Sequence, residues 1–182
     1  MMLVRYLGLH LVHFSKLLNI KKLKAIELLE PTLEKYCKEN FQNSSDVSIK
    51  LLEYKKLLLD ANKKMNLIGK STIHDFDQRH FLDCVQIHEY MPEKNKLTVD
   101  LGTGAGLPGV LLSIIGYKNL HLVEKSPKKS AFLESCKLRL GLDFVIHNQP
   151  LAEVSLSNVQ YVVARAFAPI SKILSFTKQM VN

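Results

Sequence analysis

The sequence predicts an α/β protein in which a parallel β-sheet is flanked by helices, and two observations support this fold class. From residue 97 onward, short apolar runs typical of strands alternate with longer helical patterns. Four glycines lie within eight residues directly after the first of these runs, at Gly102, Gly104, Gly106 and Gly109. The order of strand, tight turn and helix start predicts right-handed βαβ units, which bind ligands at the carboxyl ends of their strands.

The C-terminal half of the chain divides into alternating strands and helices. Strands are predicted over 97–101, 119–123, 144–146 and 161–164. Helices are predicted over 110–115, 127–140 and 170–180. Alternation of this kind is typical of one parallel α/β core.

The N-terminal half is predicted to be helical. Residues 3–29 have a mostly helical pattern, which Pro31 ends or restarts. Further helices are predicted over 47–65, which is amphipathic with a basic outer face, and over 72–90. The chain thus divides into an N-terminal appendage at 1–45, a helical subdomain at 46–95 and the α/β core at 96–182.

Composition and charge are those of an ordinary globular chain. Its 182 residues are 47% hydrophobic, and a net charge of +8 points only weakly to a polyanionic partner such as RNA. Cys37, Cys84 and Cys136 lie far apart without metal-ligand spacing, so neither disulfides nor a metal site is predicted. The sequence predicts no membrane span and no signal peptide. We expect a monomeric protein of the cytoplasm.

The glycine turn fits two kinds of nucleotide ligand. Gly104-x-Gly106-x-x-Gly109 satisfies a dinucleotide fingerprint, with Glu124 placed twenty residues later where a ribose-binding acid is expected. An alternative frame starts at Asp100, an acid on the strand before the turn. A carboxylate there is awkward beside a pyrophosphate and suits the cationic amino group or sulfonium of S-adenosylmethionine. Glu124 serves both schemes, so Asp100 favours the methyl donor over a nicotinamide cofactor or a purely structural turn.

Four segments in order carry a resemblance to a known family. The run from Asp100 to Gly109, Asp-Leu-Gly-Thr-Gly-Ala-Gly-Leu-Pro-Gly, closely resembles the signature of the RsmG (GidB) family of guanine-N7 methyltransferases of small-subunit ribosomal RNA. Asn-Lys-Lys-Met-Asn-Leu at 62–67, Arg-His-Phe-Leu-Asp at 79–83 and Ala-Arg-Ala-Phe-Ala at 164–168 resemble its other motifs. The resemblance implies a class I, Rossmann-like methyltransferase fold and spans 47–178; residues 1–45 have no counterpart.

The resemblance implies a donor site and an RNA-facing surface. Family cofactor contacts fall on Gly102, Leu107, Leu151, Ala152 and Arg165, and the residue pattern adds Asp100, Gly104, Gly106 and Glu124. Candidate RNA contacts are Lys63, Lys64, Arg79 and His80. Structural alternatives are a solvated helix face for the lysines, a helix-capping or interhelix hydrogen bond for His80, and a surface salt bridge for Arg165.

The implied reaction needs no general base. Guanine N7 carries an available lone pair, so S-adenosylmethionine and the base react once they are held in line, and no catalytic residue is assigned. We therefore expect methylation of N7 of a guanine in 16S ribosomal RNA, with the small ribosomal subunit as partner.

The chain departs from the family pattern at three places. Pro150-Leu151-Ala152-Glu153 replaces the usual Arg-x-Glu after the third strand, and Ala61 stands where the family commonly has Trp. A class I sheet has seven strands, and here only four are predicted, which leaves the strand over 161–164 as an exposed edge. The alternative is a shortened RNA-binding chain that has lost donor binding. An oxidoreductase, which rests on the dinucleotide fingerprint alone, ranks last.

Overall fold

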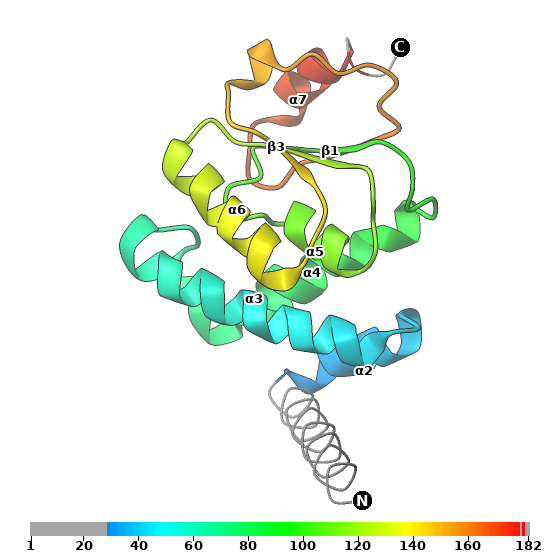
Figure 1. Ribbon diagram of the computed structural model, residues 1–182, viewed down its shortest axis with the longest axis vertical. Helices are drawn as coiled ribbons and strands as arrows, with labels where there is room; N and C mark the ends of the chain where they lie inside the picture. The colour runs from blue at the N-terminus through cyan, green and yellow to red at the C-terminus, as the bar shows by residue number, and fades with distance from the viewer. Residues whose placement is uncertain (1–28, 179, 181–182) are drawn as a thin grey trace, which may run out of the picture.

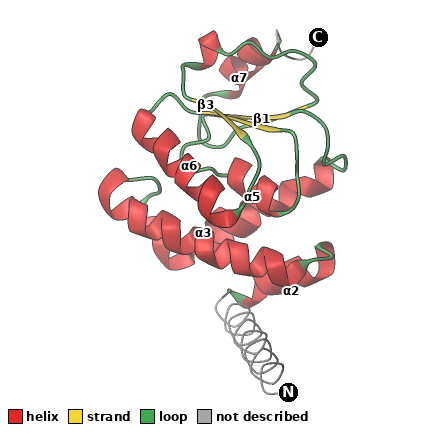
Figure 2. Cartoon of the chain, viewed as in Figure 1, coloured by secondary structure: helices red, strands yellow, loops and turns green. Residues whose placement is uncertain are grey.

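The computed structural model describes residues 29–178 and 180, and within them it shows a layered α/β arrangement (Figure 1). Helix α7 (Ile170–Thr177) covers one face of the sheet. Helices α5 (Gly109–Ile114) and α6 (Pro127–Leu140) cover the opposite face. Beyond them lie α3 (Ser44–Met65) and then α2 (Pro31–Asn40), so the helical layers are stacked on one side of the sheet (Figure 2).

The described residues form a four-stranded sheet in which every pairing is parallel, which confirms the predicted fold class. The strands are β1 (Thr98–Leu101), β2 (Leu120–Val123), β3 (Val145–His147) and β4 (Tyr161–Val163). Their order is β3-β2-β1-β4, so β1 is central and β4 lies at an edge, as predicted. All four predicted strands are present, with ends that differ by at most one residue.

The strand order places a crevice at the end of β1. From β1 the chain moves outward through β2 to β3, and then returns across the sheet to β4 on the other side of β1. In open parallel sheets, ligands bind where the order reverses in this way, outside the carboxyl ends of the strands. The glycine turn follows β1 directly and therefore lies at this point.

Helix α3 packs its apolar face against the helices that cover the sheet. Leu51, Tyr54 and Leu58 are fully buried, and their spacing places them on one side of the helix. The helix begins at Ser44, three residues before the prediction, and ends at the predicted Met65, where Asn66 takes a left-handed conformation. The amphipathic helix predicted from the sequence is thus confirmed.

The segment predicted as one helix over 72–90 is helical throughout but irregular. It consists of η1 (Lys70–Asp75), η2 (Asp77–Leu82), α4 (Asp83–Val85) and η3 (Gln86–Tyr90). In η2 the turns are of the wide, π-helical kind. His80, Phe81 and Leu82 are buried in succession, more than one face of a regular α-helix could bury. The tertiary packing therefore changed the local geometry that the apolar pattern predicted.

Helix α2 shows that Pro31 restarts a helix rather than only ending one. The side chain of Glu30 caps it by accepting hydrogen bonds from the backbone N–H groups of Thr32 and Leu33. Leu33 and Cys37 are fully buried in the same hydrophobic core as α3 and α5. This part of the predicted appendage thus packs against the rest of the protein; the predicted helix over 3–29 lies, apart from Leu29, outside the described residues.

Candidate cofactor-binding site

The glycine turn at the end of β1 has a backbone conformation that residues other than glycine rarely adopt. Gly102, Gly104 and Gly106 have φ values of +65°, +59° and +93°. The N–H of Thr103 donates to Val123 O at 3.0 Å, which ties the turn to the end of β2. The N–H of Gly106 donates to Thr103 O at 2.8 Å. The turn is therefore a fixed structure with defined hydrogen bonds.

Two of the four glycines serve packing under the turn. A Cβ on Gly106 would collide with Val110 and come within 3.0 Å of Leu133 and of the Tyr54 hydroxyl. A Cβ on Gly109 would collide with Leu122 and lie 2.8 Å from Asp100 Oδ2. The Tyr54 hydroxyl also donates to Ala105 O at 2.5 Å, so α3 supports the turn from below. Close packing therefore requires glycine at 106 and 109.

Asp100 lies beneath the turn with no exposed surface. Its Oδ2 accepts hydrogen bonds from the Thr103 hydroxyl at 2.5 Å and from the Gly109 N–H at 2.9 Å. Burial raises the pKa of this carboxyl to about 6, against the lowering effect of both hydrogen bonds. Its Oδ1 has no hydrogen-bond partner among the described residues. Asp100 thus holds the turn in place through one oxygen, and only Oδ1 remains for the ligand contact that the sequence predicts.

Glu124, at the end of β2, joins two turns at the carboxyl edge of the sheet. Its Oε2 accepts from the Gly104 N–H at 3.1 Å and its Oε1 from the Ser126 N–H at 2.8 Å. The residue is 6% exposed. The sequence placed this acid next to the glycine turn, and the structure brings the two into direct contact.

The surfaces above Gly102 and Gly104 differ. A Cβ built on Gly104 would meet only Gly102 O, at 3.8 Å, so this face is open to a ligand. A Cβ on Gly102 would collide with the ring of Phe167. Sequence reasoning assigned no role to Phe167, although its motif was recognised as a unit; the aromatic residue after Arg165 was the available signal.

After β4, the side chains of Arg165 and Phe167 point to opposite sides of the sheet, with Ala166 between them. Ala166 has a φ of +51°, in the left-handed region that residues with a Cβ seldom adopt. Phe167 packs with the apolar cluster on the α7 face, which also holds Val99 and Leu101. Arg165 instead reaches η2 and α4, which lie on the other face.

Arg165 joins the end of β4 to the second sequence motif, at 79–83. Its Nη2 donates to Arg79 O at 2.9 Å, and Nη1 and Nη2 both lie 3.3 Å from His80 Nδ1. Its Nε lies 3.4 Å from Asp83 Oδ2. The structure therefore brings together two motifs that are more than eighty residues apart in the chain.

The assignment of His80 to the RNA-facing surface is a prediction that the structure corrects. His80 is 4% exposed, and its ring nitrogens lie against Arg165 and against the Thr72 hydroxyl, the latter at 2.8 Å. Burial, and then the charge of Arg165, lower the pKa of this imidazole. The interhelix hydrogen bond that the sequence left open as the alternative is the one present.

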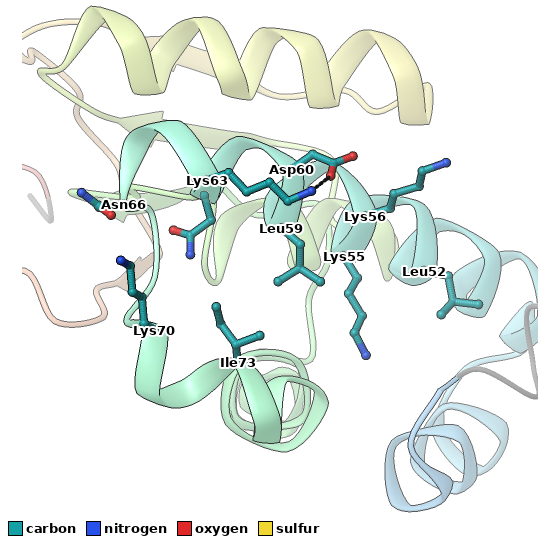
Figure 3. A pocket seen from close by; sticks show the side chains of 10 residues that line it. Leu52, Lys55, Lys56, Leu59, Asp60, Lys63, Asn66, Lys70 and Ile73 are labelled. Carbon is teal, nitrogen blue, oxygen red and sulfur yellow. Dashed lines mark hydrogen bonds and ion pairs between the residues drawn. The ribbon is translucent and has the colours of Figure 1, made fainter.

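The other predicted RNA-facing residues lie at the surface. Arg79 is 57% exposed and pairs with Asp75, and Lys63 is 75% exposed and pairs with Asp60. Lys64 is also exposed. Lys63 also lines a groove of about 960 Å³ between α3 and η1. Figure 3 shows Lys70 and Ile73 of η1 across this groove from Lys63 and Leu59 of α3. The residues that line it are Leu52, Lys55, Lys56, Leu59, Asp60, Asn62, Lys63, Asn66, Lys70 and Ile73.

The other three predicted cofactor contacts, Leu107, Leu151 and Ala152, differ in burial. Leu107 is 5% exposed, and its side chain packs in the hydrophobic core. Leu151 and Ala152 lie in the short helix η4 (Leu151–Glu153) after β3. Leu151 is half-buried in the same cluster as Phe167, and Ala152 is exposed.

Among the residues that the structure describes, no group of three or more His, Cys, Asp or Glu side chains could hold a metal ion. None of the helices placed within 29–178 is both long enough and apolar enough to cross a membrane.

The parallel sheet, the glycine turn after its central strand and the acid at the end of the neighbouring strand are consistent with the α/β domain of class I S-adenosylmethionine-dependent methyltransferases. Residues 48–182 match the model of the GidB family, described as rRNA small subunit methyltransferase G. The chain belongs to this family, as its four motifs predicted.

Curated relatives agree with the family match. The chain is 39% identical over 125 residues to "Ribosomal RNA small subunit methyltransferase G" of Rhodospirillum rubrum, an alignment of 69% of this chain and 62% of that protein. It is 36% identical over 134 residues to the protein of the same name from Rhodospirillum centenum, covering 74% and 62%. The chain is 38% identical over 140 residues to the protein of the same name from Orientia tsutsugamushi (strain Boryong), an alignment of 77% of this chain and 70% of that protein. The chain thus matches about 62% of the length of the first two relatives.

Proposed function

We propose that this chain is a ribosomal RNA methyltransferase that binds S-adenosylmethionine at the glycine turn and methylates N7 of a guanine in 16S ribosomal RNA. The relatives' names supply the reaction class and the small-subunit RNA. The observation that carries the proposal for this chain is the contact between Glu124 and the N–H of Gly104, beside the open face of Gly104. A ribosomal substrate implies that the protein works in the cytoplasm, and a monomer remains our expectation.

The residues around the turn fit the methyl donor. The glycine at 104 leaves the backbone approachable, and the Glu124 carboxylate keeps lone pairs that can accept from ribose hydroxyls. The buried Asp100 Oδ1, which lacks a partner among the described residues, suits the cationic end of the donor. When bound, S-adenosylmethionine supplies a methyl group activated by its positive sulfonium. Asp100 would thus keep the turn in shape and add a negative charge below it.

The protein's part in the reaction is to orient the two reactants. Because guanine N7 needs no deprotonation, the chain has only to hold the base in line with the methyl group and to exclude competing water. On either side of the left-handed bend at Ala166, Arg165 reaches η2 and α4, and Phe167 lies against Gly102 of the turn. We propose that these two side chains border the space that the guanine enters.

The RNA is proposed to lie along α3, η1 and η2. Lys63, Lys64 and Arg79 are exposed there, and the groove adds Lys55, Lys56 and Lys70. Lys55 pairs with Asp77 at 2.6 Å and Lys63 pairs with Asp60, so the surface is basic but partly neutralised. Phosphate contacts to such lysines would give affinity without sequence preference.

Calorimetry with matched variants tests donor binding. We expect heat on titrating the chain with S-adenosylmethionine and with S-adenosylhomocysteine. Glu124→Ala should weaken both by about tenfold or more, the effect of losing a charged hydrogen-bonding group. Glu134→Ala, which removes an exposed acid of α6, should bind both as the unaltered chain does.

Methyl transfer from labelled donor to 16S ribosomal RNA and to intact small subunits tests the reaction. Transfer that maps to N7 of a guanine supports the proposal. RNA binding without heat from either donor ligand would instead favour a chain that binds RNA but has lost the donor.

A further inference from the structure

Arg165 is held by three acceptors from one helical segment. A guanidinium can only donate hydrogen bonds, so each atom that it meets must accept one. The Arg79 carbonyl and the Asp83 carboxylate are always acceptors, whereas the imidazole of His80 accepts at Nδ1 only when that nitrogen carries no proton. The geometry around Arg165 thus fixes the protonation of His80.

The surroundings of Nε2, the other ring nitrogen of His80, agree with a proton-free Nδ1. With Nδ1 accepting from Arg165, the ring proton lies on Nε2, which is 2.8 Å from the Thr72 hydroxyl. Thr72 in turn donates its own hydroxyl proton to Gly69 O at 2.7 Å. Every donor and acceptor then matches along one direction, from Arg165 through His80 and Thr72 to Gly69.

A second proton on the His80 ring would break this series of hydrogen bonds. It would turn Nδ1 into a donor aimed at a guanidinium, and two positive groups would face each other. The charged groups near the ring are Arg165 from the end of β4, and Arg79 and Asp83 from its own segment. Asp83 is 56% exposed, so solvent screens the one negative charge.

Arg165 is also linked to the glycine turn through the bend that follows β4. Two residues later in the same bend, Phe167 contacts Gly102. At the other end of the chain of hydrogen bonds, η1 carries Thr72 together with Lys70 and Ile73 of the groove. A change in the position of Arg165 therefore reaches both the turn and the basic surface.

We propose that neutral His80 is a positioning residue that holds Arg165 at the carboxyl edge of the sheet and links it, through Thr72, to the groove between α3 and η1. The proposal rests on the proposed methyltransferase function for its effect on activity. The arrangement of His80 itself is a separate statement, which can be tested without any activity.

Nuclear magnetic resonance of the imidazole nitrogens tests the arrangement directly. At pH 7 we expect His80 to be neutral with its proton on Nε2, and Arg165→Gln should shift the Nδ1 resonance. The exposed His74 should show no such shift and serves as the internal reference. A proton on Nδ1, or a charged ring at pH 7, would overturn the proposal.

The pH profile of methyl transfer tests the effect on function. Below the usual histidine pKa of 6.5, wild-type kcat should fall with an acid limb as His80 gains a proton. His80→Asn keeps an acceptor near the position of Nδ1 but cannot be protonated, so this limb should disappear. The matched variant His74→Asn should keep the wild-type profile, and an acid limb that survives in His80→Asn refutes the proposal.

Thr72 supplies a variant that leaves the ring untouched. Thr72→Val removes the acceptor for Nε2–H and should lower kcat/KM at pH 7 by about three- to tenfold, the effect of one hydrogen bond. Thr72→Ser restores the hydroxyl and should recover most of the loss; equal activity of the two variants counts against the link to η1. If the unaltered chain transfers no methyl group, the proposed function fails, while the resonance experiment still decides whether His80 holds Arg165.

Discussion

The glycine turn and the Arg165 junction lie at the same edge of the sheet but are built in different ways. Around the turn, Asp100 accepts hydrogen bonds of 2.5 Å and 2.9 Å from residues at most nine positions away, with no exposed surface. Around Arg165, the hydrogen bond to Arg79 O measures 2.9 Å, and the contacts with His80 and Asp83 measure 3.3 Å and 3.4 Å. All three join residues more than eighty positions apart and are partly exposed.

The comparison separates a rigid half of the site from an adjustable one. Short, buried hydrogen bonds between near neighbours leave the turn few other conformations, which suits a preformed ligand cradle. Long contacts at a half-exposed junction cost little to break, which suits a part that must adapt to a large RNA.

Gly106→Ala should have the largest effect, because it adds a Cβ where Val110, Leu133 and Tyr54 already fill the space. Overpacking and a strained φ together should lower the free energy of unfolding by about 2–5 kcal/mol. Gly141→Ala is the matched control, since Gly141 has a φ of +59° and nothing within 4 Å of the added Cβ. It should lose about 1–2 kcal/mol from strain alone. Chemical denaturation of both variants measures the difference, and equal losses would contradict a tightly packed turn.

Asp100 should make the stability depend on pH. Its folded-state pKa of about 6 lies above the ordinary value of 3.8, so its stabilising effect is complete below pH 3.8 and is lost as the pH rises through 6. Between pH 4 and pH 7 the unaltered protein should lose about 2–3 kcal/mol relative to Asp100→Asn, which does not titrate. Urea unfolding of both proteins at the two pH values measures this, and parallel pH dependences would show that Asp100 keeps an ordinary pKa.

The Asp83–Arg165 pair should contribute little, in contrast to the turn. Asp83 is 56% and Arg165 31% exposed, so the coupling free energy from a double-mutant cycle of Asp83→Ala and Arg165→Ala should stay below about 1 kcal/mol. A His80→Ala and Arg165→Ala cycle should give the larger coupling of the two, because His80 is buried. The reverse order would show that charge pairing, and not the buried imidazole, holds Arg165.

Lys63→Ala should have the smallest effect, confined to RNA. Removing one phosphate contact should weaken RNA binding and reduce the slope of log K against log salt by about 0.7–0.9. Lys35→Ala, at an equally exposed position on α2, should leave both unchanged. Binding measured over a series of salt concentrations distinguishes them, and equal slopes for the two variants would remove Lys63 from the RNA surface.

Much of the glycine turn and its surroundings was predictable from the sequence because the contacts there are local. The glycines, Asp100 and Glu124 fall within one strand–turn–helix–strand stretch, where spacing alone places them at the same edge of the sheet. The four strands and α3 were predicted from local patterns of the same kind, and the family from the resemblance of its motifs. Burial was not predictable in this way, so the sequence showed an acid before the turn but not that Asp100 lies beneath it.

The sequence by itself determined the parallel α/β fold and the place of the glycine turn, because these depend on periodicity and on residue types at short spacing, and its four motifs identified the GidB family by resemblance. Only the tertiary structure decided that His80 faces Arg165 instead of solvent, that η2 widens to bury three residues in succession, and that Phe167 covers Gly102. Each of these depends on how α3, η2 and β4 pack together. Spacing along the chain carries no information about such distances between segments eighty residues apart.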